Sequence, residues 1–208
     1  MKKYELSDVV YTNLKQLFGN AFCELNYTSD YELMVAVILS AQCTDKRVNQ
    51  VTPELFKQYP SFSHLSKANI NDVEEIIKPC GFYHNKAKNI IEASVQVCTN
   101  FGGKLPSNME DLTTLSGVGR KTANVLLSNI FRVPSIAVDT HVFRVSNRLG
   151  LSKSSDVLTC EKQLMENIRR ENWSEMHHLL VLFGRYYCKA RSPKCETCVL
   201  KNICKEKK

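Results

Sequence analysis

Apolar residues recur along most of this chain at the three- and four-residue spacing of amphipathic helices. The stretch 33–40 shows this spacing clearly, and Asp30 before it is a suitable N-cap. Ser107 and Glu110 have the spacing of a capping box at the head of a further short helix. Similar helical patterns cover 48–59, 73–78, 86–99, 142–149, 161–168 and 176–187. The pattern predicts an all-α protein.

A single stretch departs from the helical spacing. Ile136, Val138 and Thr140 alternate as residues of a strand do, but Pro134 precedes them and no partner strand is indicated elsewhere. We therefore expect an extended link between two helices.

The apolar pattern gives no sign of a membrane protein. The longest apolar run, 33–39, is far too short to span a bilayer, and the first residues do not form a signal-peptide pattern. A hydrophobic fraction of 43% and a charged fraction of 24% are typical of a globular protein. We expect a cytoplasmic monomer with no membrane partner.

Basic residues are concentrated in two regions of a chain whose net charge is +7. From Arg169 to the end there are ten basic and four acidic residues, a net charge of +6. Between Arg120 and Arg148 there are five basic residues and a single acid, Asp139. Such regions are typical of a phosphate-binding surface, although a solvated helix face has the same composition.

Residues 115–123 have the pattern of a tight turn between two helices. Gly117 and Gly119 can adopt positive φ and let the backbone approach a phosphate closely. The next helix, expected to begin near Arg120, would present its unpaired N–H groups to that phosphate. We predict a helix-hairpin-helix element over about 107–128. An ordinary turn between helices is the alternative.

Lys121 lies in the first turn of the second of these helices. The helix N-terminus, the adjacent Arg120 and partial burial would each lower the pKa of its amine. A neutral amine can attack carbon and form a Schiff base, so Lys121 is the candidate nucleophile, with phosphate binding as its alternative role. Asp139 is the candidate partner, and it would also cap the helix expected near Val142. His141 is expected to be structural or to face DNA.

Four of the nine cysteines are crowded into the last 21 residues, with the spacing C-x6-C-x2-C-x5-C. Four thiolates at this spacing suit either a tetrahedral zinc ion or an iron–sulfur cluster, and the spacing leaves both open. The other five are expected to pack as small apolar residues. The four candidate metal ligands are Cys188, Cys195, Cys198 and Cys204.

A short basic loop lies between the first two of these ligands. It contains Lys189, Arg191 and Lys194. A metal that holds both ends of the loop would pre-organise these cations to meet phosphates. We therefore predict DNA-backbone contacts for all three.

Three segments of the chain resemble the endonuclease III family of DNA-repair enzymes. They are Leu115–Leu127, Val138–Val145 and Ser40–Asp45, and the likeness extends from about Leu25 to Cys204. The resemblance implies a glycosylase that excises damaged pyrimidines from duplex DNA and cleaves 3′ to the abasic site by β-elimination. It also implies one [4Fe–4S] cluster on the four cysteines.

The resemblance assigns roles to individual residues of the expected site. It makes Lys121 the Schiff-base nucleophile and Asp139 its assistant. Gln42 would fill the space left by the flipped nucleotide, and Phe82 stands where the family often has a leucine wedge. His84, in the same segment as Phe82, is a further candidate for DNA contact, as are the hairpin's two glycines and Arg120.

The resemblance further implies two helical lobes with a DNA cleft between them. The central lobe would run over 22–133, and the second would join 1–21 to 134–208 with its cysteine loop at 188–204. Ser116 replaces the proline usual in the family's hairpin, so we expect a looser turn. The alternatives are a monofunctional glycosylase of the same superfamily and a non-catalytic DNA-binding module with a structural metal.

Overall fold

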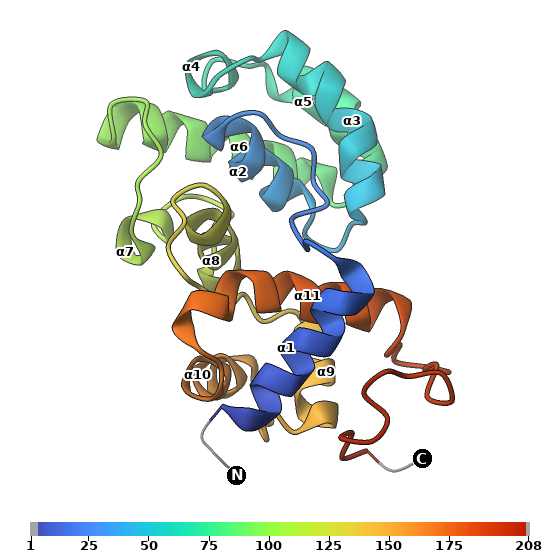
Figure 1. Ribbon diagram of the computed structural model, residues 1–208. Coiled ribbons are helices and arrows are strands. Elements are labelled where there is room, and N and C mark those ends of the chain that lie inside the picture. Colours follow the sequence, from blue (N-terminus) through green and yellow to red (C-terminus); the bar gives the residue numbers. More distant parts are fainter. Residues whose placement is uncertain (1–3, 207–208) are drawn as a thin grey trace. The chain divides into compact units, whose positions relative to one another are not determined.

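The computed structural model describes residues 4–206, and the regular elements in that range are all helical (Figure 1). This confirms the predicted all-α class. Two short 3-10 helices, η1 (Lys78–Cys80) and η2 (Arg170–Asn172), accompany the α-helices. The α-helices are α1 (Glu5–Phe18), α2 (Asp30–Leu39), α3 (Asp45–Gln58), α4 (Phe62–Leu65), α5 (Ile70–Ile77), α6 (Tyr83–Asn100), α7 (Met109–Leu112), α8 (Arg120–Asn129), α9 (Thr140–Leu149), α10 (Val157–Asn167) and α11 (Trp173–Tyr186).

The helices group into two compact units. One, the continuous unit, is Glu24–Phe131. The other, the discontinuous unit, combines Met1–Cys23 with Arg132–Lys208. Over residues 4–206, no helix has the length and apolar character that crossing a membrane requires.

The continuous unit is built around α2. Eight of its ten residues are buried, from Tyr31 through to Leu39 with the exception of Glu32, because a helix that is apolar on all sides is stable only in a core. Helices α3, α6 and α8 pack against it. Its N-cap is Ser29, whose hydroxyl accepts a hydrogen bond from the Glu32 N–H at 3.2 Å. The expected cap, Asp30, is instead the first helical residue.

The discontinuous unit is built around α11, which packs against α9 and α1. The largest fully buried side chain there is Phe183. Gly184 lets α11 and α9 approach closely, because a Cβ at this position would lie 2.8 Å from the Cβ of His141. Ile136 and Val138 are buried in the same core without forming a strand, so the segment before α9 is the extended link that was predicted.

The start of α7 also differs from its prediction. Asn108, and not Ser107, caps α7, and its side-chain oxygen accepts a hydrogen bond from the Asp111 N–H at 2.8 Å. Asn is as good an N-cap as Ser, and the shift by one residue removes Glu110 from the capping-box position.

Candidate active site

The turn between α7 and α8 has one glycine that no other residue could replace without strain. Gly117 has φ +75°, a value that side chains disfavour. A Cβ there would also lie 3.0 Å from the Cβ of Asn89 and 3.2 Å from the Cγ2 of Ile38. The turn is therefore pressed against α6 and α2, and its shape depends on Gly117.

Gly119 does not use the positive φ that a glycine can take. Its φ is −89°. It is the N-cap of α8 and makes no side-chain capping bond, and the space that a Cβ would occupy is open. A ligand oxygen can therefore approach the first-turn N–H groups of α8 at this position.

Ser116 is held by α6 through two donors, its N–H and its hydroxyl. Its N–H donates to the side chain of Gln96 at 2.8 Å, and its hydroxyl lies 3.1 Å from Asn89 Oδ1 and 3.2 Å from Glu92 Oε2. A proline has neither donor. The looser turn that we expected is therefore not found, because polar contacts replace the stiffness of the proline ring.

Lys121 is the second residue of α8, and its side chain is exposed. The partial burial expected from the sequence is therefore not found. The amine lies at the N-terminus of α8, next to the exposed Arg120.

Asp139 caps α9 in the discontinuous unit. One of its oxygens, Oδ1, accepts hydrogen bonds from the N–H groups of His141 and Val142, both at 2.8 Å. These bonds fix the direction of the half-buried carboxylate and leave its second oxygen outside the cap. The predicted capping role is confirmed. The imidazole of His141 lies 3.3 Å from the Arg144 guanidinium, which favours the structural alternative for this residue.

Two predicted DNA-contact residues share an unusual backbone conformation. Gln42, in the loop before α3, has φ 52°, and Phe82, the N-cap of α6, has φ 48°. Both are exposed, Phe82 to 65%. Left-handed backbone outside glycine is uncommon and is concentrated at functional sites. His84 is also exposed, and its ring lies 2.8 Å from the Glu74 carboxylate.

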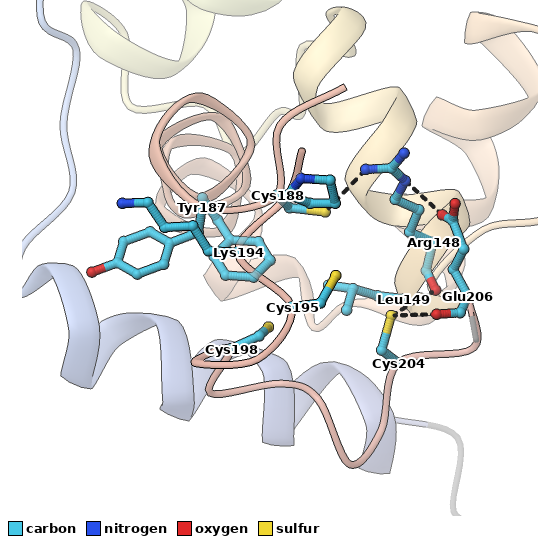
Figure 2. Close-up of a pocket in the computed structure, with 11 residues that line it drawn as sticks. Arg148, Leu149, Tyr187, Cys188, Lys194, Cys195, Cys198, Cys204 and Glu206 are labelled. Atoms are coloured by element: carbon cyan, nitrogen blue, oxygen red, sulfur yellow. Dashed lines mark hydrogen bonds and ion pairs between the residues drawn. The ribbon is translucent and has the colours of Figure 1, made fainter. Parts of the chain in front are cut away.

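The four C-terminal cysteines surround one hollow in the discontinuous unit. Figure 2 shows their sulfur atoms around this space, which is partly open to solvent. Among residues 4–206, no three His, Cys, Asp or Glu side chains are arranged to hold a single metal ion. A space bounded by four cysteine thiols matches the ligand set of a four-iron cluster, which four thiolates bind.

The chemistry of the thiols also fits a cationic cluster. Burial raises the pKa of the Cys198 thiol, and the three other thiols around the hollow raise it further. Four thiolates this close would repel one another without a positive charge between them. Iron cations supply that charge and favour the deprotonated ligands.

Two arginines that the sequence did not single out hold the cysteine loop to α9. Arg148 donates to the Cys188 sulfur at 3.6 Å (Figure 2). It also donates to the Lys189 carbonyl at 2.8 Å. Arg144 donates to the carbonyls of Cys188 and Gly184 at 3.1 and 2.9 Å. The only sequence signal was their four-residue spacing on a helix almost free of acids.

The three cations of the cysteine loop are all exposed, as their predicted role requires. Lys194 differs from the other two, because its ammonium lies 4.9 Å from the centre of the Tyr187 ring. Ser192, in the middle of the loop, has a left-handed backbone with φ 51°.

Known proteins share both the fold and these motifs. Residues 35–173 match the HhH-GPD superfamily of base excision DNA repair proteins, and residues 188–204 match the iron–sulfur binding domain of endonuclease III. The chain is 49% identical to endonuclease III of Bacillus subtilis (strain 168) over 191 residues, which cover 91% of this chain and 87% of the relative. It is 45% identical to endonuclease III of a Synechocystis species over 192 residues, or 92% and 88% of the two chains.

Two solved structures resemble this chain over almost its whole length. One is a non-covalent endonuclease III–DNA complex, and the other is a trapped endonuclease III–DNA covalent intermediate. Each matches with a TM-score of 0.93 at 43% identity, over 99% of this chain and 96% and 97% of theirs.

Proposed function

This chain belongs to the endonuclease III family of base excision DNA repair proteins, and from that membership we propose how its own residues carry out the reaction. The protein is a DNA glycosylase with AP-lyase activity that acts on duplex DNA, and its cofactor is a [4Fe–4S] cluster. This confirms the function and the cofactor that the resemblance implied.

We propose that Lys121 is the nucleophile. Its neutral amine attacks C1′ of the damaged nucleotide, the C1′–base bond breaks, and the bonding electrons leave with the base. The nitrogen then loses a proton, the C1′–O4′ bond breaks as O4′ takes up a proton, and an open-chain iminium forms. Loss of a C2′ proton from this iminium lets the 3′ phosphate depart by β-elimination. The observation that carries this role is the exposed amine at the start of α8, next to the open approach beside Gly119.

Asp139 stabilises the positive charge that develops on the sugar as the base departs. A carboxylate held by two backbone N–H groups cannot turn away from its position, so its charge is pre-organised. The same carboxylate can accept protons released by the amine.

The remaining predicted residues bind the DNA. Gln42 and Phe82 enter the duplex from their strained backbone positions, where an aromatic wedge can unstack a base step. Gly117, Gly119 and Arg120 lie against a phosphate at the start of α8. The DNA-facing side chains outside the hairpin are His84, Lys189, Arg191 and Lys194.

Cys188, Cys195, Cys198 and Cys204 hold the cluster in the hollow that they surround. When bound, the cluster links four points of the C-terminal segment and so acts as a scaffold for the basic loop. Arg148 supports this arrangement through its bond to the Cys188 sulfur.

We assign the catalytic residues and the cluster to two functional lobes. The lobe 22–133 carries the nucleophile, and the lobe formed by 1–21 and 134–208 carries Asp139 and the cluster. We place the protein in the cytoplasm, associated with the nucleoid through its substrate.

Borohydride trapping tests the nucleophile. On a duplex with thymine glycol, the Lys121→Gln protein should form no covalent adduct and no nick, because an amide cannot form a Schiff base. Its affinity for the duplex should stay within about tenfold, or ~1.4 kcal/mol. Lys67→Gln, which changes an exposed lysine of the same unit, is the matched control and should trap normally. Undiminished trapping by the Lys121→Gln protein would refute the assignment.

Asp139→Asn separates charge from capping, because asparagine is also a good N-cap. Base excision in single-turnover assays should slow by about 100-fold or more, while the thermal stability of the protein changes little. A variant as fast as the parent would reduce Asp139 to a capping residue.

A further inference from the structure

Two cysteines outside the cluster lie together in the continuous unit. Cys43 precedes α3, and Cys80 is the last residue of η1. The Cys43 thiol is near enough to raise the pKa of Cys80, and both thiols are free. Helix α3 and η1 pack against each other, which brings the two segments side by side.

The surroundings of this thiol pair are positively charged. The Lys86 side chain is only 4% exposed, and its ammonium donates to the Cys80 carbonyl at 2.9 Å. The guanidinium of Arg47 lies 3.4 Å from the Pro79 carbonyl. Burial, and then the Cys43 thiol, raise the pKa of Cys80, whereas Lys86 and Arg47 both oppose that change. The thiol pair is therefore flanked by two cationic side chains.

The two thiols differ in accessibility. Cys43 is half-buried and follows the exposed Gln42, while Cys80 is only 2% exposed. An oxidant in solution therefore reaches Cys43 first. Cys80 needs only to reach Cys43, which suits it to close a bond within the protein.

Both cysteines stand next to the residues with left-handed backbone. Cys43 follows Gln42 directly, and Cys80 lies two residues before Phe82. A covalent bond between the two thiols would tie the Gln42 segment to the Phe82 segment.

We propose that Cys43 and Cys80 are a redox modification site, which a small-molecule disulfide such as oxidised glutathione converts to a reversible intramolecular disulfide. This bond restrains the two segments and slows base excision. The part that concerns excision rests on the proposed DNA-inserting roles of Gln42 and Phe82.

The reaction is two successive thiol–disulfide exchanges. The Cys43 thiolate attacks one sulfur of oxidised glutathione, forms a mixed disulfide and releases one glutathione thiolate. Cys80 then loses its proton and attacks the Cys43 sulfur, and the second glutathione leaves as a thiolate. The two cysteines are oxidised by two electrons, and oxidised glutathione is reduced to two glutathiones. An excess of reduced glutathione reverses both steps.

Mapping of disulfides in the full-length protein with its cluster tests the site without DNA. After incubation with oxidised glutathione and alkylation of the remaining thiols, digestion should yield one linked pair of peptides that contain Cys43 and Cys80. The unfolding temperature of the oxidised protein should rise by about 5 °C, because the bond restricts the unfolded chain. Cys43→Ser should abolish both effects, and Cys80→Ser provides a second test. Cys98→Ser, at another half-buried free cysteine, should leave both unchanged.

The same oxidised sample tests the restraint. Its excision of thymine glycol should be slower by about fivefold or more and should recover after reduction, with no such change in the Cys43→Ser protein. Stable glutathionylation of Cys43 without linkage to Cys80, or linkage to a different cysteine, would overturn the site. A Cys43–Cys80 disulfide that leaves the rate of excision unchanged would refute the proposal that the bond slows base excision. A failure of the proposed function would instead appear as absent Schiff-base trapping in the fully reduced protein.

Discussion

The hairpin before Lys121 and the loop that carries the four cysteines are held in place by different kinds of interaction. The hairpin is pressed against the core of its unit, with Gly117 in tight contact with α6 and α2 and Ser116 bonded to three side chains of α6. The cysteine loop is mostly exposed, with Leu200 as its buried apolar anchor. Two arginines of α9 bind its first turn.

This difference indicates which part of each region determines its shape. Packing already positions the hairpin, so its shape does not depend on a bound ligand. The cysteine loop has too little buried apolar surface to be ordered by packing alone, and four bonds to a cluster replace that missing core. The comparison predicts that metal loss affects the loop first and that backbone changes affect the hairpin first.

The largest effect is expected from the removal of one ligand of the cluster. Cys198→Ser should lower the free energy of unfolding by about 3 kcal/mol or more, because the cluster provides much of the order in its segment. Urea unfolding with parallel iron analysis measures this, and the unaltered protein should contain roughly four irons per chain. Cys160→Ser, in the core of the same unit, provides a variant that alters packing and not metal binding. A colourless Cys198→Ser protein of unchanged stability would contradict the scaffold role.

Two glycine substitutions test the hairpin half of the comparison. Gly117→Ala should cost about 2 kcal/mol of unfolding free energy, because alanine resists φ +75° and would press on Asn89 and Ile38. Gly119→Ala should cost less than about 0.5 kcal/mol, because its φ is ordinary and its surroundings are open.

The loss of DNA affinity in these two variants should not follow their loss of stability. Gly119→Ala should weaken binding to an abasic-site duplex, since the new methyl group occupies the approach to α8. Equal losses of stability in the two variants, measured in urea, would show that the turn is not pressed against the core as described.

The smallest effects are expected from the exposed cations of the cysteine loop. Lys189→Ala and Arg191→Ala should each weaken binding to damaged and undamaged duplexes alike. The slope of log K against log salt should decrease by about 0.9 for each phosphate that is no longer neutralised. Lys153→Ala, which changes an exposed lysine elsewhere in the same unit, is the control. A change in lesion preference would mean that the loop reads bases.

Much of this protein was determined by local sequence pattern. The helical spacing of apolar residues set the all-α class, because amphipathic periodicity depends on near neighbours. A glycine followed by a helix start and a lysine was enough to place Lys121 in the first turn of α8. Asp139 was identified from the sequence as the cap of α9. The cysteine spacing indicated a four-thiolate site and left zinc and iron–sulfur open.

Only the tertiary structure decided how these local elements are supported. It showed that Ser116 is bonded to α6 residues at least 20 positions away and that Arg148 reaches the Cys188 sulfur 40 positions away. It also gave Gly119 an ordinary φ and brought the Cys43 and Cys80 thiols together. Propensity and capping act over a few residues, whereas these interactions depend on which helices pack together. That packing is the combined result of the whole core, and no single motif encodes it.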